Sequence, residues 1–379
     1  MEIYLDNCAT TKVCDAAMDA CVRAMQQDYG NPSSLHRKGL DAENIVTAAR
    51  KSVARWLNCE PGCITFTSGA TESNNLAIFG SVAARSRAGK TIVTTAIEHP
   101  SVAEPIGELE RRGYTVKRIA PKPDGNFDPD ELIDAVDADT VLFSMMMVNN
   151  EVGTVSPYQQ VIPVLRKKFP KLLIHMDGVQ GFCKLPLNLK KIDLDLFSFS
   201  GHKLYAPKGV GGLYIKKGLR ILPTVFGGGQ EQGLRSGTES VPLIAALGAA
   251  LDDYRANERA INDNYRACNA HLRELLNGVE NVIIHSPIDG APHLINCSLP
   301  GVPSEILLHT LEQQEIYVSS GSACAKGQDS SVLAAYGIPQ NELKSAVRIS
   351  FSKDTTCEQL DIFAEALKTA AEKIRKVTR

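Results

Sequence analysis

The amino-acid sequence predicts an α/β protein with a large domain on a mostly parallel, seven-stranded sheet and a smaller α+β domain. Two observations lead to this prediction. Between residues 40 and 250, apolar strand-like runs alternate with helix-like segments, as in βαβ units. Beyond residue 252 the strand-like runs become shorter. A chain of 379 residues is long enough for a large core and two domains.

Seven apolar runs give the expected strands of the large domain, at residues 64–67, 91–95, 115–119, 140–146, 172–176, 194–199 and 210–215. The helices expected among them cover residues 40–57, 72–88, 102–112, 129–136 and 159–169. Ligands of such sheets bind beyond the carboxyl ends of the strands. The residues directly after each run are therefore the first candidates for chemistry.

The C-terminal third begins with an Ala-rich helix over 243–251 and a polar helix over 254–276. Short strands are expected at 282–285, 294–298, 316–319 and 346–350, with helices between them. The last helix begins at a capping box, Thr355-Thr356-Cys357-Glu358-Gln359. We expect a large domain over 12–251 and a small domain formed by 1–11 and 252–379.

Composition excludes several function classes. The formal net charge of −2 argues against nucleic acid or an anionic membrane as the main partner. The N-terminus does not resemble a signal peptide, and no apolar run approaches the ~20 residues that span a bilayer. Ten cysteines are spread along the chain without a C-x-x-C pair. This usage predicts reduced thiols, a cytoplasmic location and no metal site.

Lys203 lies where an apolar run ends, in Ser200-Gly201-His202-Lys203-Leu204, and glycines and a second apolar run follow. A partly desolvated amine has a lowered pKa and is a better nucleophile, so Lys203 could capture an aldehyde cofactor covalently. The neighbours of Lys203 could hold a phosphate. A surface lysine in a β-turn would give the same local pattern.

A second candidate, Ser68-Gly69-Ala70-Thr71-Glu72, follows the strand at 64–67 and opens a helix. Its small residues expose backbone N–H groups where the helix dipole favours an anion, which indicates a phosphate cradle. The segment is not a P-loop, because the Gly-Lys-Ser/Thr ending is missing. An ordinary helix cap by Ser68 or Thr71 is the alternative.

Asp177, His99 and Asn150 also follow expected strands. The carboxylate of Asp177 needs a cationic partner, and a protonated pyridine nitrogen would become an electron sink beside it. A helix cap is the alternative. The imidazole of His99 could stack on a flat cofactor and shuttle protons, although a lone histidine is more often structural. The amide of Asn150 could contact a polar ring substituent.

Two further side chains suggest a substrate. Cys324 lies among small and polar residues, Ser319-Ser320-Gly321-Ser322-Ala323-Cys324, which predict an exposed loop and a nucleophilic thiol close to Lys326. Arg348 lies within a strand-like run, where a guanidinium is costly unless it binds a carboxylate. An amino-acid substrate would supply that carboxylate.

Together these positions resemble the fold-type-I pyridoxal-phosphate enzymes of the class V aminotransferase group, and within it the cysteine desulfurases of the NifS/IscS type. The resemblance covers nearly the whole chain. It is carried by Tyr4-Leu5-Asp6-Asn7, Ala9-Thr10-Thr11, Tyr29-Gly30-Asn31-Pro32-Ser33-Ser34, Thr67-Ser68-Gly69-Ala70-Thr71-Glu72-Ser73, Glu98-His99, Val148-Asn149-Asn150-Glu151, Asp177-Gly178-Val179-Gln180, Ser200-Gly201-His202-Lys203, Arg235-Ser236-Gly237-Thr238-Glu239 and Ser319-Ser320-Gly321-Ser322-Ala323-Cys324.

The resemblance implies a pyridoxal 5′-phosphate cofactor bound covalently to Lys203, with His99 stacked on its ring and Asp177 paired with the ring nitrogen. Arg348 would bind the substrate carboxylate, helped by Asn31, and Cys324 would accept the sulfur. The remaining cofactor contacts would come from Ala70, Thr71, Ser200 and His202 at the phosphate, Asn150 and Gln180 at the ring hydroxyl, and Thr238 at the phosphate in the neighbouring subunit of a homodimer.

The implied activity is the removal of sulfur from L-cysteine, which gives alanine and a persulfide on Cys324. A sulfur-acceptor protein would then serve iron–sulfur cluster, thio-cofactor or thiolated-tRNA synthesis. The run Ala325-Lys326-Gly327-Gln328 departs from the family's usual small hydroxylated residues. The sequence also ends at Arg379, without the tail that some relatives use to dock a scaffold partner. Both departures bear on which acceptor is served.

Other functions stay open at this point. A class V aminotransferase would not need Cys324 in a mobile loop, whereas a selenocysteine lyase would look much the same as a desulfurase. A non-catalytic scaffold protein would be expected to lack Lys203 or Asp177, and both are present. The SufS type of desulfurase carries its cysteine in a shorter, more ordered segment, so the context of Cys324 favours the NifS/IscS type.

Overall fold

A computed structural model describes residues 2–320 and 330–378. The large sheet of the protein has seven strands in the order β2-β8-β7-β6-β5-β3-β4. Their bounds are β2 Ile64–Thr67, β3 Thr91–Thr95, β4 Thr115–Ile119, β5 Thr140–Met146, β6 Leu173–Asp177, β7 Leu196–Ser200 and β8 Gly211–Ile215. Only β8 runs against the others, since it is antiparallel to both β2 and β7. The predicted mostly parallel, seven-stranded sheet is confirmed.

Helices flank this sheet, and α3 contacts β5, β6, β7 and β8 in turn. The helices before the C-terminal region are α1 Asp15–Gln26, α2 Arg37–Leu57, α3 Ala70–Ala84, α4 Pro100–Arg111, α5 Pro129–Asp134, α6 Tyr158–Lys168, α7 Leu189–Ile192 and α8 Val241–Ala256, with short 3₁₀ turns at η1 Pro61–Cys63, η2 Gly201–Lys203 and η3 Glu231–Gly233. Helix α1 was not among the expected elements. It packs on α8 through small residues such as Ala17 and Ala24, while Met18, Val22 and Met25 are exposed, so apolar residues on both faces hide the helical period in the sequence.

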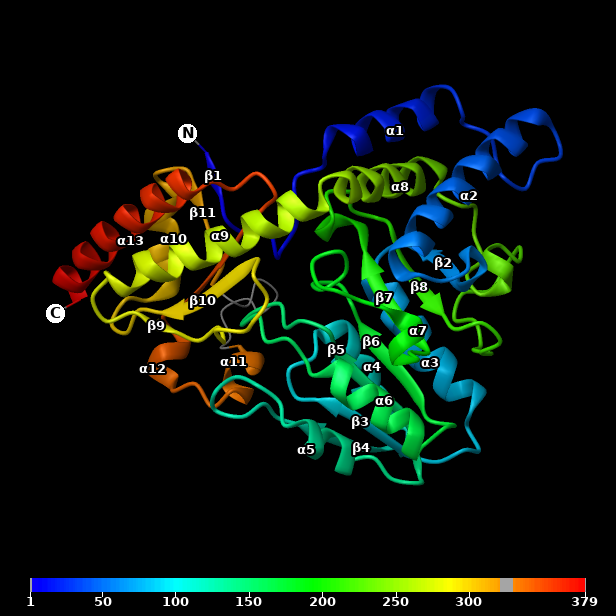
Figure 1. The fold of residues 1–379 in the computed structure, drawn as a ribbon, viewed down its shortest axis with the longest axis horizontal. Helices are drawn as coiled ribbons and strands as arrows, with labels where there is room; N and C mark the ends of the chain where they lie inside the picture. Colours follow the sequence, from blue (N-terminus) through cyan, green and yellow to red (C-terminus); the bar gives the residue numbers. More distant parts are fainter. Residues whose placement is uncertain (1, 321–329, 379) are drawn as a thin grey trace.

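The C-terminal part is built on smaller sheets. Its elements are α9 Glu258–Asn277, β9 Ile283–Ile284, β10 Leu294–Ser298, α10 Ser304–Glu312, β11 Ile316–Tyr317, α11 Ser331–Ala335, α12 Gln340–Leu343, β12 Ala346–Ser350 and α13 Cys357–Thr378. Strands β12, β10 and β9 form an antiparallel sheet, and β11 pairs in parallel with β1 Ile3–Tyr4. The first strand of the chain therefore lies beside its C-terminal elements (Figure 1). The proposed division into 12–251 and 1–11 with 252–379 stays a prediction.

The capping box expected before the last helix is present. Thr356 N–H donates to Gln359 Oε1 at 3.1 Å, and Gln359 N–H donates to Thr356 Oγ1 at 3.3 Å. These reciprocal bonds satisfy two helix-end donors and fix where α13 begins.

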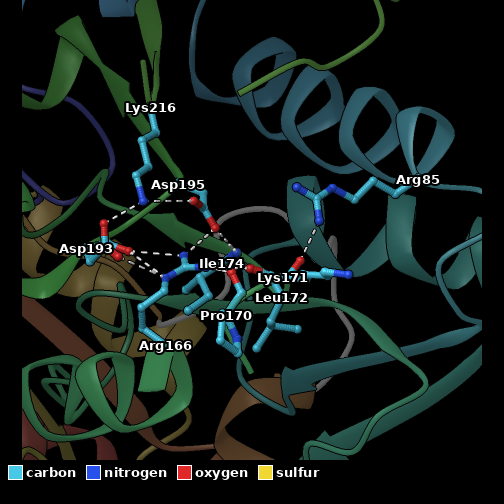
Figure 2. A network of polar contacts seen from close by, with 9 residues as sticks. All are labelled: Arg85, Arg166, Pro170, Lys171, Leu172, Ile174, Asp193, Asp195 and Lys216. Atoms are coloured by element: carbon cyan, nitrogen blue, oxygen red, sulfur yellow. Dashed lines mark hydrogen bonds and ion pairs between the residues drawn. The ribbon is translucent and has the colours of Figure 1, made fainter. Parts of the chain in front are cut away.

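A charged network holds together the amino ends of β6 and β7 (Figure 2). Arg166 of α6 donates to the backbone oxygen of Leu172 at 2.9 Å and pairs with Asp195. Asp195 in turn accepts from the backbone N–H of Ile174 at 2.9 Å. The carboxyl ends of the same strands lie at the other edge of the sheet, and that edge carries the candidate site.

Candidate functional site

A cavity of about 790 Å³ opens at the carboxyl edge of the sheet. The predicted residues that line it are Ala70, Thr71, His99, Asn150, Asp177, Gln180, Ser200, His202, Lys203 and Arg348. Most of these residues end or follow one of the strands β2, β3, β5, β6 and β7, whereas Arg348 lies within β12. Residues nearly 280 positions apart therefore meet in one cavity. The carboxyl ends of parallel strands lie at one edge of the sheet. Residues that were predicted because they follow a strand therefore meet at this edge.

Lys203 lies in η2, directly after β7. Its Nζ donates to the backbone oxygens of Cys8 and Ala9, the latter at 2.7 Å. Neither acceptor carries a full negative charge, and burial lowers the pKa of the Lys203 ammonium to about 8. A sizeable fraction of the amine is then neutral and nucleophilic near neutral pH, as the sequence predicted.

Helix α3 begins beside Lys203 with uncapped N–H groups. Its N-cap residue is Gly69, which has no side chain to bond to the first turn. A Cβ at Gly69 would meet only Ser200 Oγ, at 3.9 Å, so the cradle has open space in front of it. The alternative of a cap by Ser68 or Thr71 is therefore wrong, and the start of α3 can receive an anion.

Asp177 is the last residue of β6 and is 5% exposed. Its Oδ2 accepts from Asn74 Nδ2 at 2.8 Å, and its Oδ1 accepts from Val179 N–H at 3.0 Å. No α-helix begins directly after Asp177, so the helix-cap alternative is wrong here too. Two neutral donors leave the carboxylate able to bind a cation in the cavity.

His99 is the N-cap of α4, where its Nδ1 accepts from Ser101 N–H at 3.1 Å. The histidine thus has the structural role that the sequence left open, and it also lines the cavity. Burial lowers the pKa of His99, and nearby Lys203 lowers it further, while Asp177 opposes both effects. The ring is consequently neutral at neutral pH.

Arg348 is 3% exposed in β12 and already has a carboxylate partner. Its Nη2 lies 2.8 Å from Asp6 Oδ1, and its Nη1 donates to Asn150 O at 2.8 Å. Its Nε is buried without a partner in the described part of the chain. The sequence indicated that the guanidinium needs a carboxylate but did not indicate that Asp6 supplies one.

The buried amide oxygens of Asn150 (Oδ1) and Gln180 (Oε1) have no hydrogen-bond partner within residues 2–320 and 330–378. An unpaired buried polar atom costs free energy, so both sites fit a ligand that donates hydrogen bonds. His202 lies beside Thr10, with Nδ1 3.3 Å from Oγ1. Burial lowers the pKa of His202 to about 3 and keeps its ring neutral.

Two of the predicted residues do not line this cavity, and the structure does not describe a third. Asn31 and Thr238 are exposed and are not among the residues that line it. Cys324 lies outside the described residues.

Sequence reasoning also missed side chains that complete the site. Glu98 and Glu151 line the cavity, and Asn74 bonds to Asp177 from the second turn of α3. Burial raises the pKa of Glu98 to about 8 and that of Glu151 to about 7. The signal for Asn74 was its place four residues after Ala70, which puts both on one face of the helix.

Comparisons with known proteins agree on one family. The model of the class-V aminotransferases matches residues 3–363. A NifS/IcsS protein homolog of Lactobacillus delbrueckii subsp. bulgaricus is 41% identical, with 96% of each chain covered. The cysteine desulfurase IscS of Dictyoglomus turgidum is 35% identical over 100% of this chain and 96% of its own.

Solved structures give the same result. A NifS-like protein superimposes with a TM-score of 0.92 at 36% identity, covering 97% of this chain and 99% of its own. A structure titled SspA in complex with cysteine superimposes with a TM-score of 0.82 at 30% identity, covering 94% and 100%.

Proposed function

We propose that Lys203, His99 and Cys324 are the catalytic residues of this chain, which belongs to the class-V aminotransferase family and is a cysteine desulfurase of the NifS/IscS type. Members of this family depend on pyridoxal phosphate. The observation that carries this assignment is the meeting of Lys203, Asp177 and the uncapped start of α3 around one cavity. These are an amine for an aldehyde, a carboxylate for a protonated ring nitrogen and N–H groups for a phosphate.

The donor set of the cavity fits pyridoxal phosphate. Ala70, Thr71, Ser200 and His202 would hold the phosphate, and the unpaired amide oxygens of Asn150 and Gln180 would lie near the ring hydroxyl. Asp177 would pair with the ring nitrogen and His99 would contact the ring. When bound, the cofactor would supply an electron sink that lets the Cα proton of the substrate leave.

The residues of the chain divide the remaining work. Lys203 Nζ would bind the cofactor aldehyde and, once released by the substrate amine, accept the Cα proton. Arg348 would bind the substrate carboxylate, with Asn31 assisting. The thiolate of Cys324 would attack the sulfur of cysteine, so that a sulfur–sulfur bond forms as the carbon–sulfur bond breaks. Alanine leaves, and the persulfide on Cys324 passes to an acceptor protein.

A direct assay tests this assignment. The purified, cofactor-loaded chain should convert L-cysteine to alanine and acquire one sulfane sulfur on Cys324, which peptide mass spectrometry would detect. Selenocysteine, tested in parallel, separates a desulfurase from a selenocysteine lyase. Turnover of selenocysteine alone, or alanine formed without a persulfide, would overturn the proposal.

We further propose that the enzyme is a homodimer in which Thr238 reaches the cofactor phosphate of the neighbouring subunit. Thr238 is exposed and does not line the cavity of its own chain. Helix α1 presents Met18, Val22 and Met25 on one face, 51%, 40% and 55% exposed. A second copy would cover this apolar face. Light scattering should give twice the chain mass, and Met18→Glu with Met25→Glu should give an inactive monomer.

The partner that takes the sulfur would be a protein with a free thiol, such as an iron–sulfur scaffold or a tRNA-thiolation enzyme. The proposed location is the cytoplasm, because the nine cysteines in the described part of the chain are all free thiols. No helix in that part is long and apolar enough to cross a membrane.

A further inference from the structure

The side chains of Asn74 and Ser101 connect Asp177 to His99. Asn74 Nδ2 lies 2.8 Å from Asp177 Oδ2 and 2.8 Å from Ser101 Oγ. Ser101 Oγ in turn lies 2.8 Å from His99 Nδ1. Asn74 is fully buried and Ser101 is 7% exposed. The four side chains form a continuous line of hydrogen bonds from the end of β6, through α3, to the start of α4.

The direction of each bond follows from the chemistry of the groups. An amide nitrogen carries two hydrogens, and Asn74 Nδ2 has two acceptors, Asp177 and Ser101. Turning the amide over would place its oxygen against the carboxylate of Asp177, which repels it. Asn74 Oδ1 has no partner in the described part of the chain, so turning the amide over would also lose the two bonds of Nδ2 without gaining one for Oδ1 from those residues.

Ser101 Oγ therefore accepts from Asn74 and has one hydrogen left to donate to His99 Nδ1. The backbone N–H of Ser101 donates to the same nitrogen at 3.1 Å. Two donors converge on Nδ1, so this atom has no proton. A neutral imidazole must then carry its proton on Nε2, which has no partner within residues 2–320 and 330–378.

We propose that Asn74 and Ser101 are positioning residues that hold His99 as the Nε2–H tautomer and tie its orientation to that of Asp177. His99 then presents a hydrogen-bond donor to the cavity at Nε2 and is not a free base there. The effect on turnover rests on the proposed function, whereas the tautomer is a property of the chain itself. Burial lowers the pKa of His99, which agrees with a neutral ring.

The tautomer can be measured by long-range ¹H–¹⁵N correlation spectra of protein labelled on its eight histidines. The His99 signals are identified by their loss in His99→Gln. In the wild type, with and without pyridoxal phosphate, Nδ1 should have the shift of an unprotonated nitrogen and Nε2 that of a protonated one. In Ser101→Ala and Asn74→Ala the two shifts should move toward each other as the tautomers mix.

Two further variants separate positioning from folding. Ser101→Thr keeps the hydroxyl and should restore the wild-type shifts. Ser81→Ala removes a buried hydroxyl of α3 that donates to Ile78 O at 3.2 Å, and this change should leave His99 unaffected. In the loaded enzyme, Ser101→Ala should lower kcat about 10-fold with little change in KM, less than the about 10²-fold that severe misplacement costs.

A wild type with its proton on Nδ1, or Ser101→Ala and Asn74→Ala variants with unchanged His99 shifts, would overturn the inference. A chain that has the expected tautomer but releases no alanine from cysteine would instead overturn the proposed function, so the two failures are distinguishable.

Discussion

Arg348 Nη2 and Asp6 Oδ1 lie 2.8 Å apart in an ion pair that joins the N-terminal segment to β12. The guanidinium side chain is 3% exposed and the carboxylate side chain 20%. Ser350 N–H also donates to Leu5 O at 2.7 Å, so the pair reinforces a backbone connection. The residue proposed to bind the substrate is therefore oriented by a segment more than 340 residues away.

Replacing Asp6 should weaken cysteine binding more than chemistry. Asp6→Asn keeps an acceptor but removes the charge, so Arg348 loses its fixed orientation. We expect KM for cysteine to rise about 10-fold with a smaller change in kcat, and the free energy of unfolding to fall by about 1–3 kcal/mol. Steady-state kinetics and urea unfolding measure both effects.

The matched control is Asp252→Asn, which breaks the pair with Arg55 at 2.9 Å. Both of these side chains are more than half exposed. Asp252→Asn should therefore lower the free energy of unfolding by about 0–1 kcal/mol and leave KM and kcat unchanged. Equal effects of the two substitutions would show that Asp6 does not orient Arg348.

Cofactor capture by cofactor-free protein should depend on pH through Lys203. Only the neutral amine attacks an aldehyde, and burial lowers the pKa of Lys203 from 10.5 to about 8. The rate of covalent trapping should rise with pH and level off above about 8. Mass spectrometry after borohydride reduction would follow it.

Lys203→Ala should trap no cofactor, whereas Lys190→Ala, which changes an exposed lysine that does not line the cavity, should behave as the wild type. If the trapping rate instead reached half of its maximum near the ordinary lysine pKa of 10.5, the lowered pKa of Lys203 would be contradicted.

Glu98 should make the protein less stable as the pH rises. The folded-state pKa of this carboxyl, about 8, lies above its ordinary value of 4.5 because burial disfavours the charge. Its stabilising contribution is full below about pH 4.5 and is lost as the pH rises toward 8. Relative to Glu98→Gln, the free energy of unfolding of the wild type should fall by roughly 2–5 kcal/mol across this pH window.

Thermal unfolding of both proteins between pH 5 and 9 would measure the difference. Glu110→Gln, which changes an exposed glutamate of α4, serves as the control, and its stability curve should run parallel to that of the wild type. Parallel curves for Glu98→Gln as well would mean that Glu98 is charged in the folded protein at neutral pH.

The order of elements could be predicted because strands buried on both faces read as continuous apolar runs. Residues 140–146, for example, form β5 with every residue buried. Helix ends were less certain, since α3 begins at Ala70 and ends at Ala84 where 72–88 was expected. The helix could begin earlier because Gly69 serves as N-cap at a φ of 154° without a side-chain bond.

The site could be predicted where chemistry follows a strand, as at Asp177 and Lys203. It could not be predicted where a partner comes from another element. The pairing of Arg348 with Asp6 depends on β1 joining β11 next to β12, and one sequence does not reveal such a contact. Asn74 and Ser101 are likewise ordinary helix residues until α3 and α4 pack together.

Asp177→Asn should leave a folded protein that has lost most of its activity. A neutral amide cannot stabilise a protonated ring nitrogen, and losing comparable electrostatic stabilisation costs about 10²–10³ in rate. Asp128→Asn is the matched control, because Asp128 is a true helix cap that accepts from Asp130 N–H at 3.0 Å. Near-normal turnover by Asp177→Asn would mean that Asp177 only holds the turn after β6, through its bond from Val179 N–H.

Cys324→Ser should separate substrate binding from sulfur removal. Lys203, His99 and Arg348 are untouched, so cysteine should still bind and change the cofactor absorbance. A serine hydroxyl is a far weaker nucleophile toward sulfur than a thiolate, and it cannot hold a sulfane sulfur. Alanine release and persulfide labelling should therefore both disappear.

Cys59→Ser is the control for this last experiment, because burial raises the pKa of the Cys59 thiol to about 12 and keeps it protonated and unreactive. That variant should retain wild-type alanine release and persulfide labelling. If Cys324→Ser instead released alanine from cysteine at the wild-type rate, the sulfur would have to leave without Cys324. The assignment of Cys324 as the sulfur acceptor would then be wrong, even though the cavity around Lys203 would still bind the cofactor and the substrate.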